Sequence, residues 1–194
     1  MKRRAVFLDR DGVLVEPVYR ADSKAHEPPR RAEELALTPR AVEALRALQG
    51  ADHILLVVSN QPDVAKNKCA MSDLRQVHLA LEARLQAEKI RIERFYYCYH
   101  HPDGTHPQWS RTCACRKPGS LLLETAARDY DLDLERSWMI GDRDSDIECA
   151  RRVGSKTILV SHPHSQEYRH GARADFEARD VLEAAQIVLR RCAA

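Results

Sequence analysis

Residues 5–13 read AVFLDRDGV, and this stretch determines how the rest of the chain is interpreted. Its apolar half, Ala5 to Leu8, predicts a short strand that is buried on both faces. Asp9 and Asp11 follow directly. Because alternate side chains of an extended chain point to one side, both carboxylates can reach one reacting group. In an open parallel sheet ligands bind beyond the carboxyl ends of the strands, so this pair marks a candidate site.

Beyond this stretch, short apolar runs alternate with helical patterns along the chain. Further strands are predicted at residues 54–58, 94–98, 137–140 and 157–160, with a short edge strand at 174–176. Helices are predicted at residues 39–48, 72–88, 121–130, 146–153 and 181–191. Thr38 is the expected N-cap of the first helix. Strands that alternate with helices predict an α/β fold in which a central parallel sheet carries helices on both faces.

The length and composition fit one domain, residues 1–194, with two long polar loops at about 17–37 and 98–117. The chain has 31 Lys and Arg against 29 Asp and Glu, and the net charge of +2 gives no bulk attraction to nucleic acid or to a membrane. No apolar run approaches membrane-spanning length, and the basic start lacks the apolar stretch of a signal peptide. We therefore expect a cytoplasmic protein.

Polar residues also follow the other predicted strands, and the carboxyl ends of parallel strands share one edge of a sheet. These residues are, in chain order, Ser59, Asn60 and Gln61, then Arg116 and Lys117, then Asp142, Arg143 and Asp146. Each short motif alone is common in turns and surface loops. Their occurrence after four separate strands of one chain predicts a single site on that edge.

The residue types at this edge suit phosphoryl transfer. Asp9 and Asp142 can hold Mg²⁺, which neutralises charge between a phosphate dianion and a carboxylate nucleophile. Asp9 can attack phosphorus to form an aspartyl phosphate, while Asp11 protonates the leaving alkoxide and then activates water. Ser59 can donate a hydrogen bond, and Lys117 can place a charge, on the oxygens of the transferred group. The expected partner is therefore a small phosphorylated molecule.

Four motifs in this order, FLDRDGV, VVSNQ, CRKP and MIGDRDSD, resemble the haloacid dehalogenase (HAD) superfamily over roughly residues 4–160. The resemblance implies a three-layer α/β/α, Rossmann-like HAD fold with no large cap domain. It also implies that Asp9 is the nucleophile and Asp11 the acid/base, and that Ser59 and Lys117 bind phosphate. Asp142, the Asp11 carbonyl and, through water, Asp146 would bind magnesium. Neighbouring side chains that we expect to contact substrate are Asn60, Gln61, Arg116 and Arg143.

The loop at 98–117 carries a second candidate metal site. Cys98-x-His100 and Cys113-x-Cys115 supply four ligands, which suffice for a closed tetrahedral zinc site. His100 is the favoured histidine, with His101 and His106 as alternatives. A filled coordination sphere does not activate water, so the expected role of Zn²⁺ is to brace the loop that carries Arg116 and Lys117.

Within the superfamily, YYCYHHP and CACRKP resemble the small, capless heptose-bisphosphate phosphatases and the related histidinol-phosphatase domain. The resemblance implies hydrolysis of the 7-phosphate of a heptose 1,7-bisphosphate, with histidinol phosphate or another small metabolite as the alternative substrate. It also implies a monomer. The chain departs from the family at residues 61–67, QPDVAKN, where a run with glycine and arginine is usual. A non-catalytic zinc-stapled binding module remains a distant alternative.

Several other polar residues have plainer interpretations. Five basic side chains in the loop at 17–37 suit a second phosphate on the substrate or, individually, a solvated surface; they are Arg20, Lys24, His26, Arg30 and Arg31. The late histidines His162, His164 and His170 are expected at the surface. Nearly neutral charge and the absence of an aromatic, basic groove pattern argue against a polynucleotide phosphatase.

Overall fold

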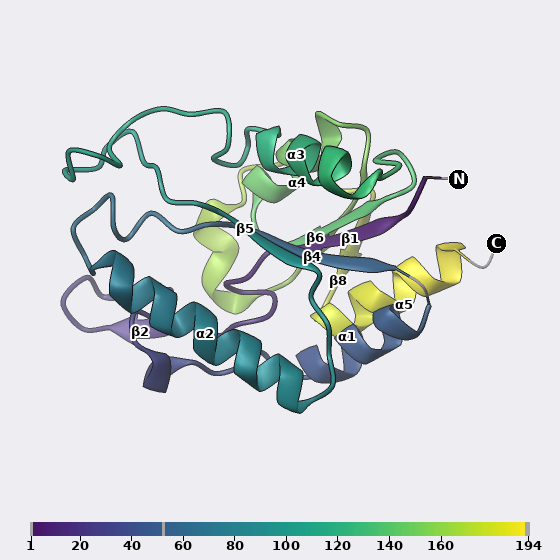
Figure 1. Ribbon diagram of the computed structural model, residues 1–194, viewed down its shortest axis with the longest axis horizontal. Coiled ribbons are helices and arrows are strands. Elements are labelled where there is room, and N and C mark those ends of the chain that lie inside the picture. The colour runs from purple at the N-terminus through teal and green to yellow at the C-terminus, as the bar shows by residue number, and fades with distance from the viewer. Residues whose placement is uncertain (1, 52, 193–194) are drawn as a thin grey trace.

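The computed structural model describes residues 2–51 and 53–192. Six parallel strands form its central sheet, in the order β5–β4–β1–β6–β7–β8 (Figure 1). They are β1 (Ala5–Leu8), β4 (Ile54–Asn60), β5 (Arg94–Cys98), β6 (Trp138–Gly141), β7 (Lys156–Val160) and β8 (Phe176–Ala178). The chain builds outward from β1 in one direction, then returns to its other side at β6. The carboxyl ends of β1 and β6 therefore flank the topological switch point, where ligands of such sheets bind.

Helices cover both faces of the sheet, which confirms the three-layer fold (Figure 1). One face carries α1 (Ala41–Gly50), α2 (Met71–Ala87) and α5 (Val181–Cys192), and the other carries α3 (Leu121–Tyr130) and α4 (Asp144–Arg151). Alternate residues of β1 divide between the two cores: Val6 and Leu8 join the first, and Ala5 and Phe7 the second. A strand that is apolar at every position is thus buried on both sides.

The first helix begins later than its sequence suggests. The Thr38 side chain does not cap it; the Thr38 hydroxyl donates a hydrogen bond of 2.6 Å to the carbonyl of Val13, in the loop that follows β1. Arg40 then adopts a left-handed conformation, and the helix starts at Ala41. The predicted N-cap was therefore wrong, and Thr38 instead ties the helix entry to the loop that follows β1.

Two other boundaries also move for identifiable reasons. The helix α4 begins at Asp144, two residues before its predicted start, because the Asp146 carboxylate accepts a hydrogen bond of 3.1 Å from the Arg143 amide in a capping interaction. The edge strand β8 begins at Phe176 because Asp175 accepts hydrogen bonds from the amide and the hydroxyl of Thr157. Ladder pairing starts only after that side chain.

The loop at 17–37 contains structure that its sequence did not reveal. Two three-residue strands, β2 (Val18–Arg20) and β3 (Ala25–Glu27), form an antiparallel hairpin, and a short 3₁₀ helix, η1 (Ala32–Glu34), follows. A second 3₁₀ helix, η2 (Pro163–Tyr168), follows β7. Among the described residues, no helix combines the length and the apolarity needed to cross a membrane.

Candidate active site

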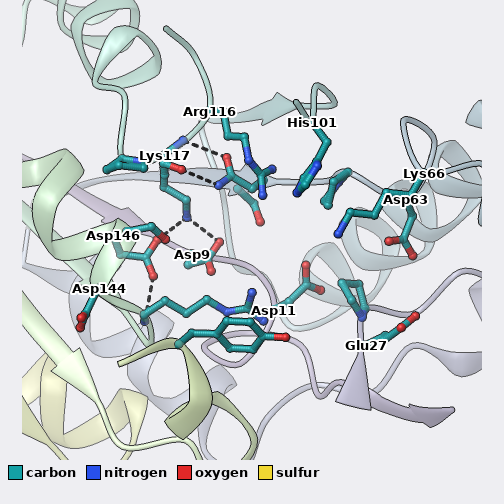
Figure 2. A pocket seen from close by; sticks show the side chains of 18 of the residues that line it. Asp9, Asp11, Glu27, Asp63, Lys66, His101, Arg116, Lys117, Asp144 and Asp146 are labelled. Atoms are coloured by element: carbon teal, nitrogen blue, oxygen red, sulfur yellow. Dashed lines mark hydrogen bonds and ion pairs between the residues drawn. The ribbon is translucent and has the colours of Figure 1, made fainter. Parts of the chain in front are cut away.

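A cavity of about 400 Å³ lies at the carboxyl edge of the sheet (Figure 2). Eight residues predicted from the sequence line it: Asp9, Asp11, Ser59, Asn60, Arg116, Lys117, Arg143 and Asp146. The other two candidates, Gln61 and Asp142, are 2% and 1% exposed and adjoin the lining residues from within the protein. The structure therefore brings the residues of all four motifs together.

Lys117 holds the centre of this site. Its Nζ lies 2.8 Å from Asp9 Oδ1 and 2.5 Å from Asp146 Oδ1, and it donates a 2.8 Å hydrogen bond to the Val58 carbonyl. Burial alone raises the pKa of Asp9, but the charge and the hydrogen bond of Lys117 outweigh burial and lower it. Asp9 is thus kept as a carboxylate, the form that a nucleophile requires.

Three buried carboxylates lie close enough to share one cation. Asp9, Asp142 and Asp146 each offer an oxygen within 4.8 Å of the others. Burial, together with the charges of Asp9 and Asp146, raises the pKa of Asp142 to about 8. Asp142 Oδ1 is buried and has no hydrogen-bond partner among the residues that the structure describes. Clustered hard oxygen ligands with one orphaned buried atom fit a divalent cation such as Mg²⁺.

This electrostatic arrangement predicts pH-dependent cation binding. Below about pH 8 the Asp142 carboxyl of the metal-free protein holds a proton, which an incoming cation must displace. The apparent affinity for Mg²⁺ should therefore rise about tenfold per pH unit between pH 6 and pH 7 and level off above pH 8. Calorimetric titration in buffers of different ionisation enthalpy would measure both affinity and proton release. An affinity that is constant between pH 6 and pH 8 would contradict this assignment.

Gly12 gives the Asp142 carboxylate its room. Gly12 has φ +85°, and a Cβ added there would lie 2.3 Å from Asp142 Oδ2. Gly12→Ala should therefore displace Asp142, weaken Mg²⁺ binding at least about tenfold, and destabilise the fold by roughly 1–3 kcal/mol through backbone strain. Gly50→Ala is the control for added volume, because a Cβ there meets no atom of the described residues within 4 Å. Calorimetry and thermal denaturation of both variants check this. Equal Mg²⁺ affinities in the two variants would refute the role of Gly12 in making room for Asp142.

Asp11 is held by two neighbours. Arg10 grips its carboxylate with Nε at 2.9 Å from one oxygen and a terminal nitrogen at 3.0 Å from the other. Gln61 Nε2 donates to Asp11 Oδ2 at 2.6 Å and to Ser59 Oγ at 3.1 Å. Gln61 was a candidate substrate contact, but its amide is engaged within the protein. Arg10 was missed, because a basic residue beside two aspartates reads as an exposed turn residue.

The remaining candidate contacts differ in what they face. Asn60 exchanges two hydrogen bonds of 3.0 Å with the backbone of Lys117, so its amide fixes the loop that carries that lysine. Arg116 donates to the His100 carbonyl at 3.3 Å and also lines the cavity. The Arg143 guanidinium lies 3.9 Å from the centre of the Tyr168 ring. Tyr168 lines the cavity from η2, 25 residues after Arg143, and no local motif announces it.

The cysteine and histidine cluster assembles beside this cavity. Cys98, His100, Cys113 and Cys115 have ligand atoms within 4.8 Å of one another. Their sulfur–sulfur distances are 3.3, 3.3 and 3.6 Å, and His100 Nδ1 lies 3.4 Å from Cys115 Sγ. A tetrahedral zinc ion with Zn–S bonds of about 2.3 Å requires separations of roughly 3.8 Å, so the thiols need to move apart by at most about 0.5 Å to bind it.

The two alternative histidines are engaged elsewhere. His101 Nδ1 accepts a hydrogen bond from the Asp103 amide, and its ring lines the cavity. His106 Nδ1 accepts one from the Gln108 amide at 3.2 Å. Of the three histidines, only His100 presents a ring nitrogen to the thiols within the cluster of described residues.

Other basic residues fall in places that the sequence did not indicate. Arg20 pairs with Glu34 at 2.7 Å and Arg30 with Asp63 at 2.9 Å, so these cations of the flap (the loop at 17–37) are neutralised by neighbours. His162 is 9% exposed and lies 3.2 Å from Glu16, so its expected place at the surface was wrong. Lys66, which no motif singled out, lines the cavity together with His101 and Arg116.

Part of the chain matches a known protein family. The HAD-hydrolase-like family model matches residues 114–184, a span that holds the Lys117 loop and the GDRDSD motif. The fold and this match define a HAD-like hydrolase. A crystal structure of a D,D-heptose 1,7-bisphosphate phosphatase from B. bronchiseptica, complexed with magnesium and phosphate, has the same fold, with a TM-score of 0.81 at 24% identity and coverage of 97% and 99% of the two chains.

Two curated relatives extend the match along the chain. A D-glycero-D-manno-heptose-1,7-bisphosphate 7-phosphatase from Chlorobaculum tepidum is 32% identical over 93% of this chain and 92% of its own. A protein of the same name from Thermosynechococcus vestitus is 33% identical, with coverages of 96% and 95%. The chain belongs to this family of HAD-like phosphatases, which confirms the resemblance drawn from the four motifs.

Proposed function

We propose that the chain is a magnesium-dependent phosphatase acting through an aspartyl phosphate, with D-glycero-D-manno-heptose 1,7-bisphosphate as substrate and its 7-phosphate as the group removed. The observation that carries the proposal is the ionised Asp9 beside Lys117 in a cavity ringed by the other motif residues. The proposal also includes a single domain that works as a cytoplasmic monomer. The charge of +2 supports a small-molecule partner, not a nucleic acid or a membrane.

The reaction divides into two steps. An Asp9 oxygen forms a bond to phosphorus while the bond from phosphorus to the sugar oxygen breaks, and Asp11 gives its proton to that departing oxygen. Water then attacks phosphorus, Asp11 takes back a proton, and the bond to Asp9 breaks to release phosphate. Ser59 and Lys117 bind the oxygens of the transferred group in both steps.

Asp9, Asp142 and the Asp11 carbonyl would hold Mg²⁺, with Asp146 acting through water. The bound ion supplies charge neutralisation between the phosphate and the nucleophile. Cys98, His100, Cys113 and Cys115 would hold a structural Zn²⁺ that braces the loop in front of Arg116 and Lys117. The clustering of the four ligand atoms within 4.8 Å of one another supports this role.

The choice of a bisphosphorylated sugar rests on the names of the relatives and on the basic side chains along one wall of the cavity. Figure 2 shows Arg116, His101 and Lys66 along the wall that leads away from Asp9 and Asp146. Arg116 and Lys66 supply positive charge, and His101 adds two ring nitrogens, where a second phosphate of a short sugar would lie. Histidinol phosphate, which has one phosphate and a cationic amine, would gain nothing from these groups.

Phosphate release from a panel of esters tests the proposal. The panel contains both anomers of heptose 1,7-bisphosphate, fructose 1,6-bisphosphate, histidinol phosphate and a 3′-phosphorylated oligonucleotide, each with Mg²⁺. The highest kcat/KM is expected for a heptose bisphosphate. A preference for histidinol phosphate would overturn the substrate but keep the chemistry, whereas no turnover of any ester would favour a zinc-stapled binding module.

A further inference from the structure

Arg10 is a buried arginine between two residues that line the candidate active site, Asp9 and Asp11. Its side chain is 1% exposed, although an arginine is seldom buried without a specific partner. Its guanidinium forms a two-point contact with Asp11 on one side and lies 5.8 Å from the centre of the Tyr97 ring on the other. These contacts hold the guanidinium in one orientation beside the Asp11 carboxyl group.

Gln61 also contacts the Asp11 carboxyl group, from the end of the neighbouring strand. It follows β4, and its amide nitrogen bridges Asp11 Oδ2 at 2.6 Å and Ser59 Oγ at 3.1 Å. Ser59 is a proposed phosphate-binding residue, so one amide links the orientation of the acid/base to that of the phosphate-binding hydroxyl. Gln61 is 2% exposed and is absent from the cavity lining, so it acts on substrate only through these neighbours.

Three donors thus fix a carboxyl group whose own exposure is 6% and which lines the cavity. A planar guanidinium fork defines the plane of a carboxylate, which a lysine ammonium cannot do. Proton transfer depends steeply on such alignment, because the donor must reach the leaving oxygen at hydrogen-bond distance.

We propose that Arg10 and Gln61 are positioning residues that orient the Asp11 carboxyl group toward the leaving oxygen of the substrate. The inference rests on the proposed function, in which Asp11 is the acid/base. Neither residue touches the reacting atoms. Their loss should therefore slow a reaction only as far as its leaving group needs a well-placed proton donor.

Leaving-group dependence separates this role from a merely structural one. The esters are 4-nitrophenyl phosphate, whose stable phenolate departs without a proton, then phenyl phosphate, and then a primary alkyl phosphate, which needs a proton most. The parameter kcat/KM reports steps up to the phosphorylation of Asp9 and excludes the later hydrolysis. In Arg10→Lys and in Gln61→Met, kcat/KM for the alkyl ester should fall at least about tenfold further than for the nitrophenyl ester, within the 10²–10⁴-fold range of general acid catalysis.

Arg20→Lys is the matched control, because Arg20 makes a similar two-point contact with Glu34 in the flap, outside the cavity lining. That variant should keep the wild-type ratio between esters. Should Arg10→Lys fail to fold, Gln61→Met carries the test, with circular dichroism to verify its fold. An equal loss for all three esters in a folded variant would overturn the positioning role. A wild-type protein inactive on every ester with Mg²⁺ would overturn the proposed function instead.

Discussion

Asp9→Asn should lower the turnover of every phosphomonoester by at least about 10⁴-fold while the protein stays folded. A carboxamide oxygen is a poor nucleophile. The carboxamide is also neutral, so it does not replace the negative charge of the carboxylate that lies 2.8 Å from Lys117 Nζ. Stability should change little, since the lost pairing with Lys117 is offset by relief of repulsion from Asp142 and Asp146, whose oxygens share the same cluster. Initial rates with saturating Mg²⁺ and a thermal melt measure the two quantities.

Asp131→Asn is the control for this substitution. Asp131 is exposed and ends α3, and its left-handed φ of 50° is one that asparagine also tolerates. It should therefore retain wild-type turnover. If Asp9→Asn keeps more than about one-hundredth of the wild-type rate after correction for deamidation, Asp9 is not the nucleophile.

The wild-type protein should bind one zinc ion per chain, and Cys113→Ser should bind less than about one-tenth of an ion per chain. The turnover of Cys113→Ser should fall about tenfold or more. A hydroxyl ligates Zn²⁺ far less well than a thiolate does, and three remaining ligands leave the site open. Arg116 and Lys117 directly follow Cys115, so an unbraced loop would blur the position of the lysine that contacts Asp9.

Zinc content is measured by elemental analysis after extensive dialysis, and loop order by amide hydrogen exchange over residues 98–117. Cys69→Ser is the matched control, because Cys69 lies outside the cluster of described ligand atoms. Faster exchange confined to that loop is expected only for Cys113→Ser. An unchanged zinc content in Cys113→Ser would show that the four groups are not the ligands.

The edge of the sheet that carries the candidate active site was predictable because its sequence motifs are local. Asp9 and Asp142 each follow a buried apolar strand, and parallel strands must end at one edge, so backbone geometry brings distant carboxylates together. The cysteine cluster was predictable for a related reason. Two pairs of Cys or His ligands, each pair separated by one residue, are typical of side chains that bind one shared metal ion. Their spacing does not identify the histidine, because the path of the loop decides which ring faces the thiols.

Features that depend on long-range packing were not predictable. Arg10 looks solvated in the sequence, but it is buried because its guanidinium contacts both Asp11 and the Tyr97 ring of β5. Tyr168 contacts Arg143 only because η2 packs beside the loop that follows β6. The strands of the flap are three residues each, too short for any alternation to register. Thr38 would cap a helix by propensity, but the Val13 carbonyl competes successfully for its hydroxyl.

If the phosphoryl group passes through a covalent bond to Asp9, chemical trapping should capture that intermediate. The enzyme with Mg²⁺ and its best substrate is quenched during turnover, and the acyl phosphate is reduced with borotritide. Tritiated homoserine is expected at position 9 in the peptide spanning AVFLDRDGV, and no label without substrate. Label at another aspartate, or none in an enzyme that is turning over, would contradict it.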